Sequence, residues 1–345
     1  MRYRFLGTSG LKVSELCLGT MSFGTRWGFG ADEDESRRII HAFKDAGGNF
    51  LDTANRYHDG ESEEIVGRAI ETDRDRWVVA TKYTLAMGTQ DPNRAGNSRK
   101  NMMRSVEASL KRLKTDYLDL LYVHFWDYTT TPEEVMRGLD DLVRSGKVLY
   151  VGVSDAPAWI VSQANTLASL RGYSAFVGLQ IEYSLIQRTV ERELLPMAEA
   201  LGLSVLPWAP IGGGVLSGKY TRSAGAPEDT KRAAGNARRL TEQNLAVAKE
   251  VDRIADAIGK SSAQVALAWI RARGPHIPIV GARTVAQITD LMGSTEFALA
   301  DEHRASLDAL SAVPLGFPRE FGGQMRGVVY GDLDAMIDYP RGARP

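Results

Sequence analysis

The sequence predicts a (β/α)8 barrel, in which parallel strands alternate with helices and close into a cylinder. Eight short runs are continuously apolar, as is typical of parallel strands covered on both faces, and amphipathic stretches of helical period separate them. Polar side chains follow several of these runs, at the position where such a barrel carries its chemistry. The 345 residues, 43% of them apolar, suffice for one large domain of this kind.

The expected elements follow in order along the chain. An opening hairpin pairs residues 3–6 with residues 11–13 around the turn Gly7-Thr-Ser-Gly10. The strands are expected at residues 15–20, 49–53, 77–82, 118–124, 148–153, 177–182, 204–208 and 276–280. The helices are expected at residues 34–46, 61–70, 98–113, 132–145, 159–170, 190–200, 242–258, 262–272 and 301–312. Eight such alternations favour a closed barrel over an open doubly wound sheet.

Three segments are additions to the minimal barrel. Residues 210–240 form a long loop after the seventh strand, and its length favours a functional role. The helices at residues 242–258 and 262–272 are extra elements before the eighth strand. The composition of residues 314–345, with Gly, Pro, Phe and Tyr, suggests an irregular tail laid over the barrel. We expect a single domain, residues 1–345, whose barrel spans about residues 14–313.

Charge and composition exclude several classes of partner. The 42 basic and 43 acidic residues balance to a net charge of −1, which gives no electrostatic case for nucleic acid or an anionic membrane. The N-terminus lacks the apolar stretch of a signal peptide, and no apolar run approaches a membrane-spanning length. The lone Cys17 fits a reducing compartment, so we expect a cytoplasmic protein, with its oligomeric state open. The five histidines and Cys17 lack the spacing of a metal site.

Four polar residues at or just after strand ends suggest a proton-transfer site: Asp52, Tyr57, Lys82 and His124. Tyrosine alone is a weak acid with a pKa of about 10. A nearby ammonium group favours the phenolate, so Lys82 is expected to lower the pKa of Tyr57. Asp52 can keep Lys82 charged and in place, and His124 can hydrogen-bond a substrate oxygen. Taken singly, each residue is more often structural than catalytic, so the hypothesis rests on the four together.

The segments around these residues carry a family resemblance. The stretch Gly48-Asn-Phe-Leu-Asp-Thr-Ala-Asn-Arg-Tyr57-His-Asp-Gly60-Glu-Ser-Glu-Glu-Ile-Val-Gly67 resembles the most specific signature of the aldo-keto reductases. Leu6-Gly-Thr-Ser-Gly-Leu-Lys-Val13, Leu18-Gly-Thr-Met21 and Arg112-Leu-Lys-Thr-Asp116 are also similar to that family, in particular to its aryl-alcohol dehydrogenase-like and potassium-channel β-subunit-like branch. The resemblance covers about residues 3–310 and implies an NADPH-dependent reductase of aldehydes or ketones, with Tyr57 as general acid.

The same resemblance implies where a nicotinamide cofactor binds, with NADPH expected and NADH as the alternative. Ser154 and Gln180 would bind the carboxamide, and Trp208 would stack on the nicotinamide ring. Arg283 would pair with a 2′-phosphate, which favours NADPH. The full set of cofactor residues that the resemblance implies is Thr20, Met21, Asp52, Ser154, Asp155, Gln180, Trp208, Ala209, Pro210, Ile211, Gly212, Gly213, Lys219, Gly281, Arg283, Gln287 and Asp290. No glycine-rich dinucleotide fingerprint stands between a strand and a helix.

Two positions depart from the family pattern. Asp155 stands where the family usually has asparagine, and a carboxyl group cannot donate to the carboxamide oxygen unless it is protonated. Leu291 stands where the family often has asparagine, which removes one hydrogen bond to the adenine. Both changes put cofactor affinity in question.

Aromatic residues after three of the strands are candidates for an apolar substrate pocket. They are Phe23, Trp27, Phe29, Tyr83, Phe125, Trp126 and Tyr128, and they favour aromatic or medium-chain aldehydes. Two other functions compete with the reductase. One is a cofactor-binding regulatory module that resembles the potassium-channel β subunits, although their pattern lacks the histidine found at His124. The other is a lyase with Lys82 as a Schiff base, which a neighbouring Asp52 disfavours.

Overall fold

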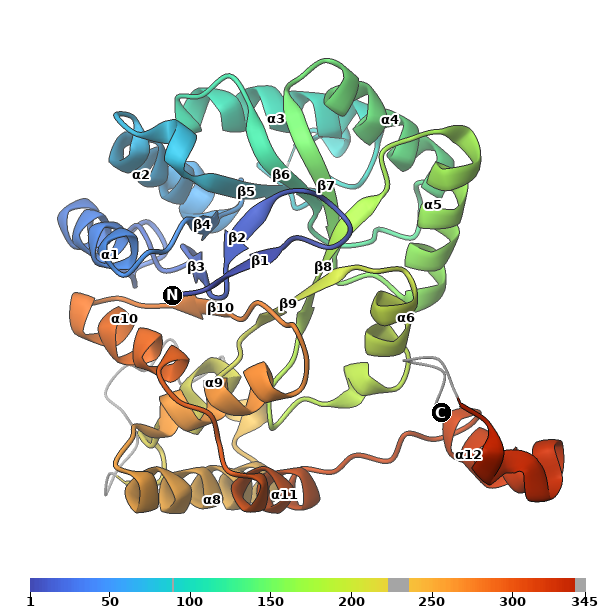
Figure 1. Cartoon of the computed structure of the whole chain (residues 1–345). Coiled ribbons are helices and arrows are strands. Elements are labelled where there is room, and N and C mark those ends of the chain that lie inside the picture. The colour runs from blue at the N-terminus through green and yellow to red at the C-terminus, as the bar shows by residue number, and fades with distance from the viewer. Residues whose placement is uncertain (89, 223–235, 339–345) are drawn as a thin grey trace.

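Eight parallel strands form a barrel in the computed structural model, which describes residues 1–88, 90–222 and 236–338 (Figure 1). The strand order in the sheet is β10-β3-β4-β5-β6-β7-β8-β9. The strands are β3 (Cys17–Gly19), β4 (Phe50–Asp52), β5 (Val78–Tyr83), β6 (Leu118–Val123), β7 (Val148–Ser154), β8 (Phe176–Glu182), β9 (Ser204–Trp208) and β10 (Ile279–Gly281). Ile277, just before β10, donates its backbone N–H to the carbonyl of Val205 in β9 at 2.9 Å, which closes the ring. The predicted barrel and all eight strands are confirmed.

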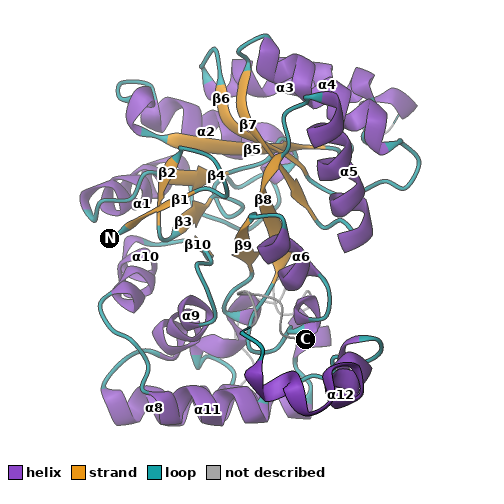
Figure 2. Cartoon of the chain, turned by 45° about the vertical axis from the view of Figure 1, so that its right-hand side comes forward, coloured by secondary structure: helices purple, strands orange, loops and turns teal. Residues whose placement is uncertain are grey.

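Helices surround the barrel on its outer side (Figures 1 and 2). They are α1 (Glu33–Asp45), α2 (Glu61–Ile70), α3 (Arg99–Leu113), α4 (Pro132–Arg144), α5 (Ala158–Arg171), α6 (Leu194–Ala200), α8 (Glu242–Ile258), α9 (Ser262–Ala272), α10 (Val285–Met292) and α11 (Asp301–Leu310), and a further helix, α12 (Arg319–Tyr330), follows them in the chain. The extra helices α8 and α9 are as predicted. The stretch predicted as one helix at 190–200 is instead a 3-10 turn, Thr189–Glu191, followed by α6. Pro196 has no N–H and is tolerated in a first helical turn, so α6 begins just before it.

The hairpin of β1 (Tyr3–Phe5) and β2 (Lys12–Ser14) lies across the end of the barrel where the strands begin (Figure 1). Leu6 and Val13 are fully buried and pack with Cys17 and Phe50 inside the barrel. The hairpin therefore closes the N-terminal end of the barrel and leaves the opposite end for chemistry.

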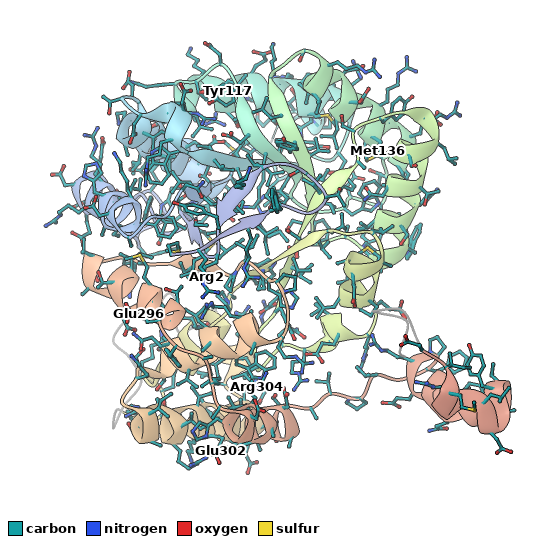
Figure 3. All side chains as sticks on the ribbon, viewed as in Figure 1. Arg2, Tyr117, Met136, Glu296, Glu302 and Arg304 are labelled. Atoms are coloured by element: carbon teal, nitrogen blue, oxygen red, sulfur yellow. The ribbon has the colours of Figure 1, made fainter. Side chains whose placement is uncertain are left out.

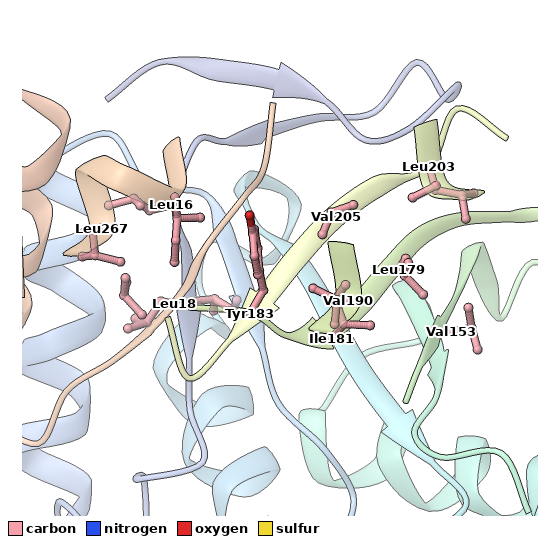
Figure 4. Packing of buried hydrophobic residues seen from close by; sticks show 14 of the residues in the cluster. Leu16, Leu18, Val153, Leu179, Ile181, Tyr183, Val190, Leu203, Val205 and Leu267 are labelled. Atoms are coloured by element: carbon pink, nitrogen blue, oxygen red, sulfur yellow. The ribbon is translucent and has the colours of Figure 1, made fainter. Parts of the chain in front are cut away.

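The apolar core has two layers because successive side chains of a strand point to opposite faces. One set of alternate residues fills the barrel interior, and the other packs outward against the helices. Figure 4 shows part of the outward layer, with Leu16, Leu179 and Val205 among the residues drawn. Inside the barrel the ring of Tyr122 lies so close to Gly152 that a Cβ there would meet it at 2.5 Å. Glycine is therefore required at that position of β7.

The prediction that residues 314–345 form an irregular tail laid over the barrel was wrong. Part of it forms the regular helix α12, which has no buried residue and stands away from the barrel in both views (Figures 1 and 2). Arg319 at its start donates to the carbonyl of Glu191 at 2.7 Å, and Arg192 donates to the carbonyl of Pro314 at 2.9 Å. Glycine lowers helix propensity, and three glycines within α12 hid the helical spacing of its apolar residues. No helix within the described residues is long and apolar enough to cross a membrane.

A buried histidine gives the fold a specific acid sensitivity. His276 is 7% exposed and its ring meets that of Tyr183 edge-on, with centroids 5.7 Å apart. Burial, together with the positive charge of Arg273, lowers the pKa of His276 to about 4. The unfolded chain binds a proton near pH 6.5 and the folded chain does not, so stability present above pH 6.5 is lost as the pH falls towards 4.

We therefore expect the unfolding free energy to fall by about 2 kcal/mol when the pH is lowered from 7 to 5, because of His276 alone. Urea unfolding at both pH values measures this difference in the wild type and in His276→Gln, whose pH dependence should be weaker by that amount. His41→Gln, at an exposed position of α1, is the matched control. An equal pH dependence in wild type and His276→Gln would contradict the prediction.

Candidate active site

The register of the barrel brings the predicted polar residues to one inner ring. Phe50, Ala80, Tyr122 and Leu206 point into the barrel. Because side chains alternate along a strand, residues two positions further on point inward as well. Those residues are Asp52, Lys82, His124 and Trp208, and the same alternation places Ser154 opposite Gln180 on β7 and β8. The carboxyl ends of all six strands therefore aim polar or aromatic groups at the same opening.

Lys82 lies at the centre of this ring and is fully buried. Its Nζ donates to Asp52 Oδ2 at 2.6 Å, to the carbonyl of Thr53 at 2.8 Å and to the Tyr57 hydroxyl at 3.1 Å. Burial alone lowers the pKa of an ammonium group, but the charge of Asp52 and the contact with Tyr57 outweigh it and raise the pKa of Lys82. Lys82 is therefore charged at every physiological pH, which opposes the Schiff-base hypothesis.

Tyr57 stands at the start of a 3-10 turn, Tyr57–Gly60, immediately before α2. The pKa of its phenol is raised, because burial outweighs the opposing effect of Lys82. This corrects the expectation that Lys82 lowers it below the usual value. Tyr57 is a neutral phenol at physiological pH, which is the state that a proton donor needs.

His124 completes the group beside Tyr57. The two rings meet edge-on, with centroids 5.9 Å apart. Burial and the nearby charge of Lys82 hold the pKa of His124 well below its usual value, so the imidazole is neutral. Its buried Nδ1 has no hydrogen-bond partner among the described residues. A neutral imidazole carries one N–H, which can donate to a substrate oxygen without competing for the proton of Tyr57.

The neighbouring strand ends hold Gln180, Asp155 and Trp208 in a chain of contacts. Gln180 Nε2 donates to Asp52 Oδ1 at 2.8 Å, so it fixes the acid that holds Lys82. Trp208 Nε1 donates to Asp155 Oδ1 at 3.0 Å. Burial raises the pKa of Asp155 to about 6, although the Trp208 hydrogen bond opposes the shift. Asp52 and Trp208 thus have fixed orientations around the opening.

Two loops near this opening contain the other predicted cofactor residues. After β9, Ala209, Gly212 and Gly213 adopt positive φ angles, and Asn236 donates to the carbonyl of Gly213 at 2.8 Å. Lys219 lies with its Nζ 4.8 Å from the centre of the Tyr220 ring. The middle of the predicted loop at 210–240, residues 223–235, lies outside the described residues.

The loop after β10 leads into α10, which Thr284 caps. Gln287 Oε1 accepts from the backbone N–H of Arg283 at 2.8 Å. Asp290 accepts from Ser261 at 2.9 Å and from Gln264 at 3.1 Å, so its carboxylate joins α9 to α10. Leu291 packs in the core.

Comparison with known proteins identifies the family. A sequence model of the aldo/keto reductase family matches residues 15–312. The chain belongs to the aldo/keto reductase family. It is 40% identical to aryl-alcohol dehydrogenase [NADP(+)] of Phanerodontia chrysosporium, over 90% of this chain and 85% of that protein. It is 38% identical to norsolorinic acid reductase of Aspergillus flavus, over 92% of this chain and 83% of that protein.

Membership of the aldo/keto reductases makes the protein an oxidoreductase that uses a nicotinamide cofactor and reduces small carbonyl compounds. The predicted enzyme class is therefore confirmed. The comparisons give no support to the regulatory-module alternative.

The residues present fit such a cofactor in their chemistry. Trp208 is half-buried and offers a flat aromatic face beside the ring of polar groups. Lys219 and Arg283 place cationic side chains on the two loops that follow the last two strands. Thr20 and Met21 follow β3 at the same end of the barrel. The Thr20 hydroxyl is turned inward, 3.1 Å from the carbonyl of Asp52, and Met21 is exposed.

The predicted substrate pocket needs correction. Phe23, Tyr83 and Trp126 are at most 1% exposed and belong to the core, so they present no surface to a substrate. Trp27 stacks on His58, with centroids 4.7 Å apart, and remains half-buried, while Phe125 is 44% exposed. Three of the seven predicted aromatics therefore lie in the core behind the site, whereas Phe29 is half-buried and Tyr128 is exposed.

The sequence did not reveal two groups that help to hold the site together. The Thr53 carbonyl supplies the third partner of Lys82, and Ser62 on α2 shares a 2.8 Å hydrogen bond with Thr20 that ties the loop after β3 to the site. A backbone carbonyl leaves no trace in a sequence, and a helix serine is usually on the surface. Among the described residues no group of three or more potential ligands is arranged to hold a metal ion.

Proposed function

We propose that the protein is an NADPH-dependent reductase of aldehydes or ketones in which Tyr57 protonates the carbonyl oxygen. The observation that carries this proposal is the contact of Tyr57 with Lys82 at 3.1 Å, inside a group whose charge Asp52 balances. The name of the Phanerodontia relative includes NADP(+), which supports NADPH over NADH.

Each residue of the group then has one task. When bound, the cofactor supplies the hydride that attacks the carbonyl carbon. Tyr57 donates its proton to the oxygen, and the charge of Lys82 stabilises the phenolate that remains. Asp52, itself held by Gln180, keeps Lys82 in place. His124 orients the substrate oxygen with a neutral imidazole.

The cofactor residues divide by the part of the molecule that they would hold. Ser154, Gln180 and Trp208 would bind the nicotinamide, and Asp52, Thr20 and Met21 would lie beside it. The loop of Ala209, Pro210, Ile211, Gly212, Gly213 and Lys219 would cross the pyrophosphate. The adenosine phosphate would lie on Gly281, Arg283, Gln287 and Asp290, near the start of α10, where backbone N–H groups favour an anion. The Asp290 contacts with α9 would give that segment a fixed base.

A cofactor titration tests this proposal. NADPH is expected to bind more tightly than NADH and to quench tryptophan fluorescence through Trp208. Arg283→Gln should weaken NADPH binding by about tenfold and leave NADH binding unchanged, because only NADPH carries the 2′-phosphate. Equal affinities of the wild type for both cofactors would remove the role of Arg283, and binding of neither would contradict the proposed function.

The proposed substrates are aromatic or medium-chain aldehydes. Trp27 and the exposed Phe125 offer apolar surface near the opening, and a relative named as an aryl-alcohol dehydrogenase supports the aromatic class. Similar kcat/KM values for glyceraldehyde and for substituted benzaldehydes would oppose this specificity. We also propose a cytoplasmic location, because the single buried cysteine suits a reducing compartment, and cell fractionation would test it.

A further inference from the structure

The carboxyl group of Asp155 is held rigidly beside the nicotinamide-binding face proposed for Trp208. Asp155 directly follows β7 and has a positive φ of 45°, a conformation that aspartate tolerates better than most residues. Its backbone N–H donates to the carbonyl of Gln180 at 3.2 Å. Its Oδ1 accepts from Trp208 Nε1 at 3.0 Å, so side chain and backbone are both anchored.

Asp155 differs from the other acids around the opening in its charge balance. Asp52 is paired with Lys82, and Glu182 is paired with Arg239. Asp155 forms no ion pair with any described residue, and the indole N–H that it accepts from is neutral. Glu182 repels the charge of Asp155, Lys82 attracts it, and Tyr57 is close enough to be affected by it. The ring of polar groups therefore contains one carboxylate that lacks a compensating cation.

We propose that Asp155 makes this enzyme bind the oxidised, positively charged form of its cofactor more tightly than the neutral reduced form. The inference rests on the proposed function, which puts the nicotinamide against Trp208. A carboxylate fixed next to Trp208 is then close to the charge of the oxidised ring, and burial strengthens the attraction. Its oxygens can also accept a hydrogen bond from the carboxamide N–H.

A preference for the oxidised cofactor affects the direction of the reaction and makes cofactor binding depend on pH. Ionised Asp155 stabilises the positive charge that hydride donation creates, so it favours carbonyl reduction over the reverse reaction. It also slows release of the oxidised cofactor. Asp155 is ionised above a pH of about 6 and protonated below it. The preference for the oxidised form is thus expected at neutral pH and lost under acidic conditions.

The test compares NADP+ and NADPH binding by calorimetry at pH 8 and pH 5. In the wild type, the ratio of the NADPH Kd to the NADP+ Kd should fall by about fivefold between pH 8 and pH 5 if NADP+ lowers the pKa of Asp155 by about one unit. The 2′-phosphate titrates near pH 6 in both forms, so its effect cancels in the ratio. NADP+ binding near pH 6 should also release more protons than NADPH binding.

Asp155→Asn is the matched variant, because its amide oxygen still accepts from Trp208 Nε1 and only the charge is removed. Its ratio should be low and the same at both pH values. The inference would be overturned if the ratio of the two Kd values in the wild type did not change with pH. It would also be overturned if, at pH 8, the wild type and Asp155→Asn gave the same ratio. The wild-type measurement decides the matter even if the variant does not fold. Failure of the wild type to bind either form would contradict the proposed function instead.

Discussion

Replacing Tyr57 by phenylalanine is expected to lower kcat for carbonyl reduction by about 10²–10⁴-fold, because the variant loses the proton donor. The fold should tolerate the change, since the phenylalanine ring keeps the edge-on contact with His124 and loses only the hydroxyl that meets Lys82. The Kd of NADPH should stay close to its wild-type value. Stopped-flow measurement of hydride transfer and a separate binding titration resolve the two quantities.

The raised pKa of Tyr57 also predicts the shape of the pH profile. Reduction needs the protonated phenol, which is the dominant form throughout the neutral range, so its rate should change little with pH there. Alcohol oxidation needs the phenolate, so its rate should rise as the pH increases. The rise of the oxidation rate with pH should be absent in Tyr57→Phe, which has no phenol to ionise.

Tyr117→Phe is the matched control for loss of a tyrosine hydroxyl. Tyr117 lies on the outer side of the barrel before β6 (Figure 3), and its hydroxyl donates to Asp75 rather than to any group of the site. Its kcat should equal that of the wild type. A Tyr57→Phe enzyme that retained more than about a tenth of the wild-type kcat would rule out Tyr57 as the proton donor, given the usual size of general acid catalysis.

Separating the members of the Asp52–Lys82 pair is expected to cost about 3–5 kcal/mol of unfolding free energy, because each single change leaves a buried charge without its partner. Lys82 is 0% exposed and Asp52 is 2% exposed, so water cannot replace the missing partner. Lys82→Met and Asp52→Asn should each show the loss in urea unfolding monitored by circular dichroism. The double variant should recover much of it, because it removes both charges.

An exposed ion pair provides the control for this experiment. Lys114 and Glu71 form a pair at 2.8 Å on the surface, with side chains 44% and 53% exposed. Lys114→Met should cost about 0–1 kcal/mol, since solvent screens such pairs. If Lys82→Met lowers the unfolding free energy no more than Lys114→Met does, the Asp52–Lys82 pair is not a buried ion pair. Its proposed role in the site would then be wrong.

The strands and helices were predictable because their signals are local. A continuous apolar run indicates that both faces of a strand are buried, and helical periodicity indicates that one face of a helix is buried. Either pattern is present whichever neighbouring element buries that face. For the same reason Asp52, Lys82 and His124 could be assigned to one site, since parallel strands place their carboxyl ends at the same end of a barrel. The tail was mispredicted because α12 has no buried residue and therefore no apolar face set by a core, and only its glycines were conspicuous in the sequence.

The sequence by itself thus determined the barrel, the four-residue group and the family to which they belong. The tertiary structure decided the properties that depend on burial. It raised the pKa of the Tyr57 phenol despite the neighbouring Lys82, removed Phe23, Tyr83 and Trp126 from the predicted pocket wall, and left Asp155 with no described ion-pair partner beside Trp208. Desolvation and distances between residues far apart in the chain produce these effects, and neither is encoded in local residue spacing.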